Sequence, residues 1–301
     1  MPCTRTALAW LATTVLVLSI TLTPQTGATQ GKEPPFVSGL LDLRLSNDYL
    51  TPRGLIVENS GVVAQPVLLL FFNLYEGEGP LSNVTATLGM FNSVHSKQRD
   101  PQNVSSTPNW NEMDLISSLS ATLLKDWKFT FGYEYWVSPI DAFSSSSHIE
   151  LRFAYSDHFL KGLMPNMPGT LSINPYFNIF VELHNKTVVS TTSESHYFEL
   201  GAVPRYVFDG YPLTIELPTY LTFPGDHYYS QNSTLGVFGT GVKVTAPLTF
   251  IRPRYGKWSV HTDLIYKHLI NDGIVAGNLL LPPHAGTRDP VQVVGGLTLY
   301  F

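Results

Sequence analysis

Alternation of apolar and polar residues recurs along this chain and limits the folds open to it. In residues 127–135, WKFTFGYEY, every odd position is aromatic, whereas the even positions carry lysine, threonine, glycine and glutamate. Residues 39–48, 148–156 and 258–267 alternate in the same way. Because successive side chains of an extended strand point to opposite faces, each segment has one apolar and one polar side. The pattern predicts β-strands whose two faces differ chemically.

About twelve such segments are expected in the chain. We place them near residues 38–49, 61–75, 82–94, 110–123, 126–137, 147–157, 171–184, 195–207, 211–222, 234–250, 257–268 and 291–301. The second segment is apolar on both faces, and the tenth is rich in glycine. The 23 glycines and 22 prolines punctuate the whole chain, which favours many short strands joined by turns over helices.

The connections between these segments alternate in length. Those after the second, fourth, sixth, eighth and tenth segments are mostly short, for example KD and DGY. Those after the third, fifth, seventh, ninth and eleventh are longer and more polar, and only the first, TPRGLIVENS, blurs the contrast. Short turns at one end and long loops at the other are typical of outer-membrane barrels. We therefore expect an all-β transmembrane antiparallel β-barrel, with a soluble β-sandwich as the alternative fold.

The N-terminus has the composition of a targeting segment. An apolar run over residues 7–22 follows a single positive charge, and Pro24 and small residues up to Ala28 come after it. This order predicts a secretory signal peptide over residues 1–28, with a membrane anchor as the alternative.

The rest of the chain is expected to form a short N-terminal periplasmic segment, residues 29–36, and the transmembrane barrel, residues 37–301. No apolar segment after residue 35 is long and charge-free enough to predict a spanning helix. The only cysteine, Cys3, lies in the signal peptide. The net charge of −5 provides no basic patch, so no nucleic-acid partner is expected.

Two stretches resemble known families. The final strand, VVGGLTLYF, with Phe301 at its end, is similar to the recognition signal of bacterial outer-membrane barrels. That resemblance implies insertion by the barrel-assembly machinery and contact with outer-membrane lipid.

The second resemblance covers the first strand and loop, residues 38–66. This stretch resembles the start of the TorF-type porin family, in which an alternating strand leads to an S-D-Y-x-x-R-G-like turn. Here the turn reads Asn47-Asp48-Tyr49 and then Arg53-Gly54, with a proline inserted before the arginine. Residues 109–136 are similar to the acidic and aromatic strand pair of the same family. The resemblance implies a barrel in the cell outer membrane and does not identify a solute.

The polar residues give no signature of catalysis, metal or cofactor. A barrel hydrolase needs a histidine and a serine on one strand face near the outer rim, and no H-x-S sequence occurs. Ser259 and His261 share a face, but they lie near the periplasmic end and are expected to be hydrogen-bonded lumen residues. No two of the nine histidines have the i, i+2 spacing of neighbouring ligands on a strand. We expect a protein that is not an enzyme and has no cofactor.

Charged residues on the inward faces are expected to define the function. The assigned registers place ten acidic residues inside, namely Asp42, Asp48, Glu112, Asp114, Glu134, Glu150, Glu182, Glu199, Glu216 and Asp263. They place six basic residues there, namely Arg44, Lys128, Arg152, Arg205, Lys243 and Lys267. Because lining charges set pore selectivity, we expect an outer-membrane channel for passive diffusion of small polar solutes. A closed barrel that anchors or binds a partner through its outer loops is the alternative.

Two sets of side chains follow from this interpretation. The predicted pore-lining set is Asp42, Arg44, Glu134, Glu150, Arg152, Glu182, Glu216, Lys243 and Asp263. Asp42 and Arg44 are expected to pair, as are Glu150 and Arg152, whereas Glu134, Glu182 and Glu216 are expected to be unpaired. The predicted aromatic girdles at the membrane interfaces are Trp110, Trp127, Trp136, Trp258, Tyr300 and Phe301.

Overall fold

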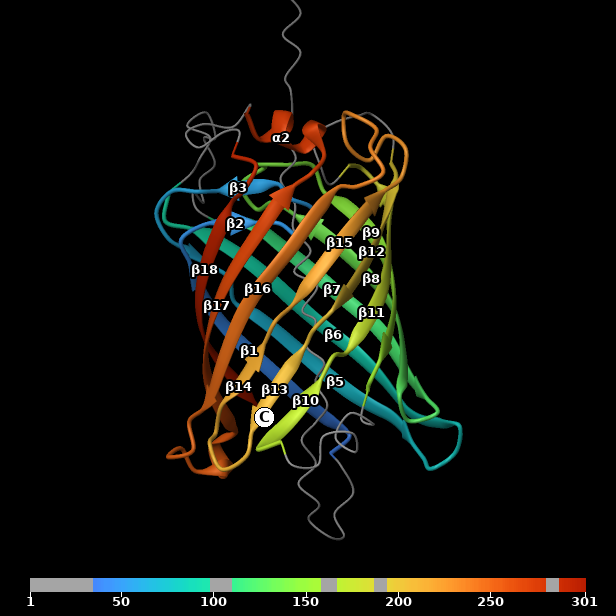
Figure 1. Ribbon diagram of the computed structural model, residues 1–301, viewed down its shortest axis with the longest axis vertical. Helices are drawn as coiled ribbons and strands as arrows, with labels where there is room; N and C mark the ends of the chain where they lie inside the picture. Colours follow the sequence, from blue (N-terminus) through green and yellow to red (C-terminus); the bar gives the residue numbers. More distant parts are fainter. Residues whose placement is uncertain (1–34, 98–109, 158–166, 187–193, 280–286) are drawn as a thin grey trace, which may run out of the picture.

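One sheet closes on itself to form a barrel in the computed structural model (Figure 1). The structure describes residues 35–97, 110–157, 167–186, 194–279 and 287–301. The predicted signal peptide and nearly all of the predicted segment 29–36 lie outside these ranges. The barrel is antiparallel and has 12 strands, which confirms the fold predicted from the alternation.

The barrel strands follow the chain in order. They are β1 (Val37–Ser46), β4 with β5 (Val63–Ala64, Val67–Glu76), β6 (Leu81–His95), β7 (Trp110–Leu123), β8 (Trp127–Val137), β9 (Ser146–Tyr155), β10 with β11 (Gly169–Ser172, Pro175–His184), β12 with β13 (His196–Ala202, Arg205–Phe208), β14 with β15 (Thr214–Glu216, Thr219–Pro224), β16 (Val237–Pro247), β17 (Lys257–Leu269) and β18 (Val291–Tyr300). In the described parts of the connections there are four short elements, namely β2 (Tyr49–Leu50), β3 (Ile56–Glu58), η1 (Pro253–Tyr255) and α2 (Asp272–Leu279).

The first and last strands join to close the barrel. β1 pairs with β18 in antiparallel register, with Leu41 opposite Leu299 and Leu45 opposite Gly295. The seam ends with two backbone hydrogen bonds between Gly39 and Phe301, of 2.8 and 3.0 Å. Every neighbouring pair is antiparallel, so each strand runs opposite to the next around the ring.

Prolines divide three of the twelve strands into two pieces each. Pro66 separates β4 from β5, Pro204 separates β12 from β13, and Pro218 separates β14 from β15. Proline has no N–H to donate to the ladder, so regular pairing is interrupted there. A fourth break, between β10 and β11, is stabilised by Asp157, whose carboxylate accepts hydrogen bonds from the backbone N–H groups of Ile173 (2.6 Å) and Asn174 (2.9 Å).

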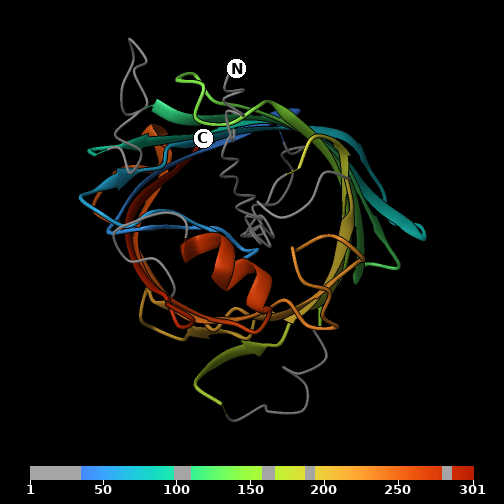
Figure 2. The same cartoon turned by 90° about the horizontal axis from the view of Figure 1, so that it is seen from above.

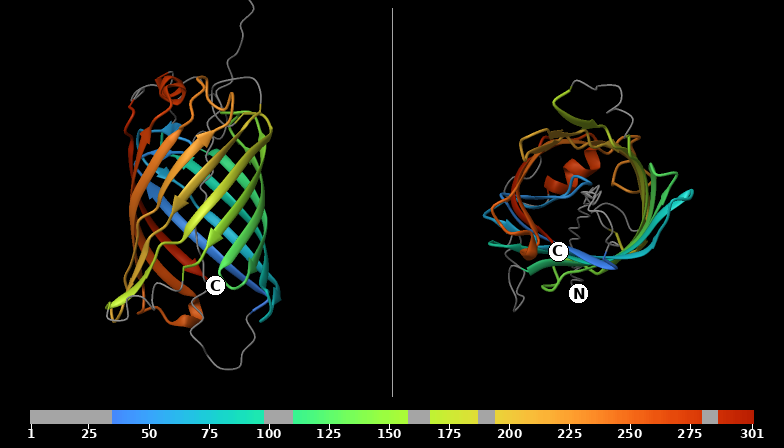
Figure 3. Two further views of the ribbon diagram at one scale, coloured as in Figure 1. Left: turned by 45° about the vertical axis from the view of Figure 1, so that its right-hand side comes forward. Right: turned by 90° about the horizontal axis from the view of Figure 1, so that it is seen from below.

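The connections sort by end of the barrel, as their lengths predict. The chain segments 47–62, 138–145, 225–236 and the one containing α2 lie at one end, and the turns at 77–80, 124–126 and 209–213 lie at the other, together with the C-terminus (Figures 1 and 3). We call the first the loop end and the second the turn end. Within the described residues, no helix is long and apolar enough to cross a membrane.

The two faces of the sheet have opposite chemistry. The outward face is apolar, and its exposed side chains include Leu43, Leu45, Leu88, Leu119, Leu200 and Leu264. On the same strands the alternate positions are polar and buried, among them Asp42, Ser120, Glu199 and His261. A water-soluble protein distributes these residue types the other way round.

Candidate functional site in the barrel lumen

The predicted pore-lining residues all lie on the inward face of the barrel. Asp42, Arg44, Glu134 and Glu182 are buried, and the remaining five are partly buried: Glu150, Arg152, Glu216, Lys243 and Asp263. Whether they line a conducting pore stays a prediction, because their position alone does not show that solutes pass them.

A hydrogen-bonded network around Asp42 occupies the turn-end half of the lumen. Its carboxylate accepts hydrogen bonds from Arg44 Nε (2.5 Å) and Thr298 Oγ1 (2.9 Å). His261 lies between two carboxylates, with Nε2 3.1 Å from Asp42 Oδ1 and Nδ1 3.1 Å from Asp263 Oδ1. The predicted Asp42–Arg44 pair is present, and His261 is a hydrogen-bonded lumen residue as expected.

Opposite charges stand next to one another on the strands beside this network. Arg205 Nε lies 3.7 Å from Glu216 Oε1. Glu216 is opposite Lys243 across the β14–β16 pair, and Lys243 is opposite Asp263 across the β16–β17 pair. Oppositely charged cross-strand neighbours attract, so this wall is electrically mixed.

The facing strands carry an acidic wall, which we define as Glu112, Asp114, Glu134, Glu150, Glu182 and Glu199. These residues come from the consecutive strands β7, β8, β9, β11 and β12. Neutral side chains donate hydrogen bonds to several of them: Glu150 accepts from Asn178 Nδ2, and Glu199 accepts from the Tyr176 hydroxyl at 2.8 Å. The Arg152 guanidinium lies 3.7 Å from the centre of the Tyr176 ring. The lumen is thus more acidic on one side than on the other.

The prediction that three carboxylates have no charged partner is wrong for two of them. Glu182 forms an ion pair with Lys186 (2.8 Å), and Glu216 lies 3.7 Å from Arg205. Glu134 accepts a hydrogen bond from the neutral Trp136 Nε1 (3.0 Å). The alternation identifies inward positions on one strand, but it gives no information about partners supplied by loops or distant strands. Lys186, for example, follows β11 in the loop-end connection.

A chain segment that the sequence assigns to a surface connection fills part of the lumen. Loop 1, residues 47–62 with β2 and β3, runs across the loop end inside the ring of strands (Figure 2). Tyr49 and Leu55 are at most 1% exposed. The Tyr49 hydroxyl donates to Glu112 of the acidic wall, and Lys267 Nζ donates to the carbonyl of Thr51. Loop 1 is therefore fixed to both sides of the barrel.

Two other loop-end segments hold loop 1 in place. Asn278 of α2 donates to the carbonyl of Gly54 (2.9 Å) and accepts from the N–H of Ile56 (3.0 Å). The Tyr229 hydroxyl donates to the carbonyl of Arg53 (2.9 Å), and burial raises the pKa of this hydroxyl, which keeps it a neutral donor. Gly54 has a φ of +86°, and a Cβ there would lie 2.5 Å from the side chain of Leu269. Glycine is thus required where the loop turns.

Arg53, at the tip of loop 1, is fully buried among rings of the barrel wall. Its guanidinium carbon lies 4.1 Å from the ring centre of Phe180, 4.8 Å from that of Trp136 and 5.6 Å from that of Tyr197. The sequence interpretation used Arg53 only as part of a turn motif and missed its role in the lumen. The sequence did contain a signal that loop 1 lies inside the barrel, because residues 67–72 are apolar on both faces and the inner face therefore needs an apolar partner. The inward side chains Val67 and Leu69 pack in one buried cluster with Tyr49 and Leu55 of loop 1.

Two of the predicted girdle residues point into the lumen. Trp136 is 0% exposed and lies on the same face as Glu134, which it contacts. Tyr300 shares the inward face with Thr298 and packs against the buried cluster. Both assignments are wrong for the same reason. Each residue is the direct neighbour of an outward residue on its strand, so its own side chain points inward.

The other four predicted girdle residues lie on the outward side. Trp127 and Phe301 are 46% and 56% exposed at the turn end. Trp258 pairs with the outward Leu299, and Trp110 pairs with the outward Val94 across an irregularity in the β6–β7 ladder. Their positions at the two ends of the apolar band agree with the expected girdles, whose contact with a membrane interface stays a prediction.

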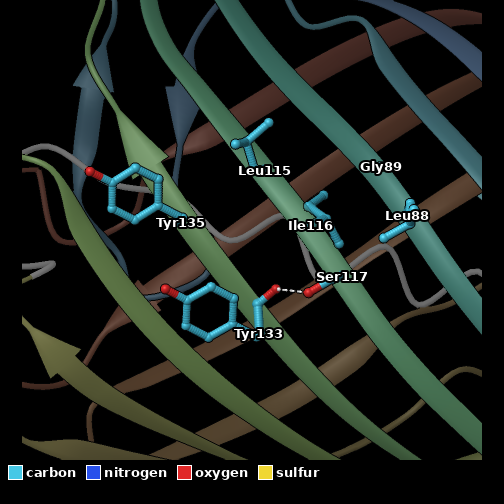
Figure 4. Close-up of a pocket in the computed structure, with 7 residues that line it drawn as sticks. All are labelled: Leu88, Gly89, Leu115, Ile116, Ser117, Tyr133 and Tyr135. Atoms are coloured by element: carbon cyan, nitrogen blue, oxygen red, sulfur yellow. Dashed lines mark hydrogen bonds between the residues drawn. The ribbon is translucent and has the colours of Figure 1, made fainter.

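A shallow hollow of about 520 Å³ lies on the outward face between β6, β7 and β8 (Figure 4). Its wall includes the exposed Leu88, Leu115 and Tyr133. One hydrogen bond crosses it, from Ser117 Oγ to the carbonyl of Tyr133 at 3.2 Å. Because the hollow belongs to the apolar exterior, it is not an opening into the lumen.

Comparison with known proteins finds other barrels of similar length. The COG4313 outer membrane channel from Pseudomonas putida F1 is 12% identical with a TM-score of 0.49, and covers 91% of this chain and 98% of its own. The NanC porin is 9% identical with a TM-score of 0.46, and covers 86% of this chain and 98% of its own. No protein-family model and no curated protein matches the sequence. The TorF-type resemblance stays a prediction, and we draw the function from the geometry of this chain.

Proposed function

We propose that this protein is an outer-membrane channel for the passive diffusion of small polar solutes. The observation that carries the proposal is the inverted distribution of residues, with an apolar exterior and a charged interior on the same strands. A closed barrel has no backbone edge left unpaired, so it can sit in hydrocarbon with its apolar side outward. Its interior then provides a polar route that the surrounding bilayer lacks.

The ends of the barrel support an orientation in the membrane. In bacterial outer-membrane barrels the short turns face the periplasm and the long loops face outward. On this basis the turn end, with Trp127, Trp258 and Phe301, is periplasmic, and the loop end with α2 is external. Delivery by a signal peptide, insertion by the barrel-assembly machinery and kinship with TorF-type porins belong to the same proposal.

The lumen charges support a weak preference for cations. The acidic wall faces a mixed wall, so negative charge exceeds positive charge along the route past loop 1. Charged linings set ion selectivity, but their fields are screened within ~10 Å at 0.1 M salt. Loop 1 narrows the route at the loop end, so small solutes are favoured over large ones.

Flux into liposomes tests this function. The purified barrel is reconstituted into lipid vesicles, and swelling is recorded with uncharged sugars of increasing size. We expect swelling that falls as the sugar grows, and faster swelling with Asn278→Ala, which releases loop 1 from α2. Heat-denatured protein is the control. If folded, inserted barrels of both forms pass none of the sugars, the channel proposal fails and the closed binding barrel replaces it.

A further inference from the structure

Three rings on the lumen wall form an aromatic cage, defined as Trp136 on β8, Phe180 on β11 and Tyr197 on β12. The Phe180 ring is stacked 6.0 Å from Trp136 and 5.1 Å from Tyr197, measured between ring centres. The His148 ring lies 5.0 Å from Phe180 and closes the same surface. All of these residues belong to the closed sheet, so the cage is built by the barrel itself.

The cage has the features of a site for a flat organic cation. Aromatic faces attract cations, and a guanidinium is planar and weakly hydrated, so it stacks on rings more readily than an ammonium ion does. Glu134 lies two residues from Trp136 on the inward face of β8, and Glu182 lies two residues from Phe180 on that of β11, so both carboxyl groups border the cage. Glu134 also accepts a hydrogen bond from Trp136 Nε1, which ties this carboxylate to the cage.

The group that occupies the cage comes from a loop rather than from the wall. Arg53 reaches it from loop 1, which is otherwise attached through backbone hydrogen bonds to Asn278, Tyr229 and Lys267. These attachments do not involve the guanidinium. We therefore expect that replacing Arg53 by a smaller residue leaves the three rings in place and frees the space over them.

We propose that the aromatic cage is a binding site for alkylguanidinium cations, which the chain's own Arg53 fills so that loop 1 is held across the lumen. A solute with a guanidinium group competes with Arg53 for the same rings and loosens the loop. The effect on permeation rests on the channel function proposed above. The binding itself does not, because it can be measured on a barrel that conducts nothing.

Calorimetric titration of methylguanidinium into the purified barrel tests the site. We expect saturable binding by Arg53→Ala, with at least about tenfold weaker binding by the wild-type protein, in which the side chain competes at high effective concentration. Arg53→Ala with Phe180→Leu should lose the binding. Arg252→Ala is the control, because Arg252 is exposed at the turn end and its removal should leave no guanidinium site behind.

The choice of cation separates this site from non-specific attraction to an acidic lumen. Methylammonium should bind Arg53→Ala about tenfold more weakly than methylguanidinium, because its compact charge is more strongly hydrated. Equal binding of the two cations, or no binding to a variant that remains a heat-modifiable barrel on a gel, overturns the assignment. Conductance is recorded separately, so failure of the channel function does not count as failure of this site.

A second variant covers the case in which Arg53→Ala does not fold. Phe180→Leu keeps the arginine and removes one ring of the cage. Trypsin should then cleave after Arg53 at least about tenfold faster than in the wild-type barrel, since cleavage requires the buried side chain to leave the wall. Mass spectrometry identifies the cut. Unchanged resistance at Arg53 in folded Phe180→Leu shows that the ring does not retain the loop, and the proposal fails.

Discussion

The side-chain amide of Asn278 in α2 donates to the backbone carbonyl of Gly54 in loop 1 at 2.9 Å. The same amide accepts from the N–H of Ile56, so one buried side chain satisfies the backbone on both sides of Leu55. This contact joins segments more than two hundred residues apart in the sequence, and it connects the helix at the loop end to the segment that crosses the lumen.

Replacement of Asn278 by alanine should loosen loop 1 and leave the pairing of the barrel strands intact. Two buried backbone groups lose their partners, at a cost of about 2–3 kcal/mol. Amide exchange at residues 54–58 should rise by about one to two orders of magnitude, measured by mass spectrometry in detergent.

Asn271→Ala is the matched control for that experiment. Asn271 is equally buried and also has two backbone hydrogen bonds, to Gln231 and Gly273. Its replacement should speed exchange near those residues and leave residues 54–58 unchanged. Equal exchange at 54–58 in Asn278→Ala and wild-type protein would show that α2 does not hold loop 1.

Asp42→Ala should destabilise the barrel strongly. Arg44 and His261 both direct nitrogen atoms at this buried carboxylate, so its removal leaves a buried arginine without its partner. Losing one partner of a buried ion pair costs about 3–5 kcal/mol. Urea unfolding in lipid vesicles measures the change. Asp42→Asn keeps an acceptor for Thr298 and should lose less, and equal losses for the two variants would contradict the assigned role of the charge.

A pair of substitutions on β7 tests whether the apolar exterior faces lipid. Leu119 is 49% exposed on the outward side, whereas its neighbour Ser118 faces the lumen. Leu119→Arg should lower the free energy of unfolding in vesicles by about 2–4 kcal/mol, as expected for arginine in the hydrocarbon region. Ser118→Arg should cost less, because the lumen is polar. In a soluble protein, arginine at an exposed position such as 119 is harmless, so an unaffected Leu119→Arg would argue against a membrane-spanning barrel.

Ion selectivity should follow the acidic wall. The double variant Glu134→Gln and Glu199→Gln removes two buried carboxyl groups from the lumen, and at pH 9 the reversal potential under a KCl gradient should shift towards anions. The shift should shrink as salt rises from 0.1 M, where screening acts over ~10 Å, to 1 M, where it acts over ~3 Å. Glu78→Gln, in the exposed 77–80 turn, is the control and should change nothing. A selectivity unaltered by the double variant would mean that ions do not pass the acidic wall.

The alternation was sufficient to predict the barrel because every strand needs one apolar face on the outside and one polar face towards the lumen. The inward positions of Asp42, Glu150 and Lys243 followed from it directly. Loop 1 could not be placed in this way, since its contacts with Asn278, Tyr229 and Lys267 depend on three-dimensional closure and on residues far along the chain.

Side chains near strand ends were the other source of error. Trp136 and Tyr300 were assigned to the girdles because aromatic residues favour interfaces, although their own strands place them inward. Gly239 lies in the tenth predicted segment, which is rich in glycine. In the structure, a Cβ at Gly239 would lie 2.3 Å from the Tyr220 ring, and the Tyr220 hydroxyl donates to the carbonyl of Pro52 in loop 1. The glycine thus provides room for a contact that holds the loop, which the sequence did not indicate.

Single-channel recording in planar lipid bilayers tests most directly whether the lumen conducts. We predict discrete current steps from the wild-type barrel in KCl, with larger steps or longer openings from Asn278→Ala. The insertion of each form is verified by its resistance to SDS before boiling. Bilayers that stay silent with both forms, while the protein is inserted and folded, would contradict a channel and identify the molecule as a closed barrel.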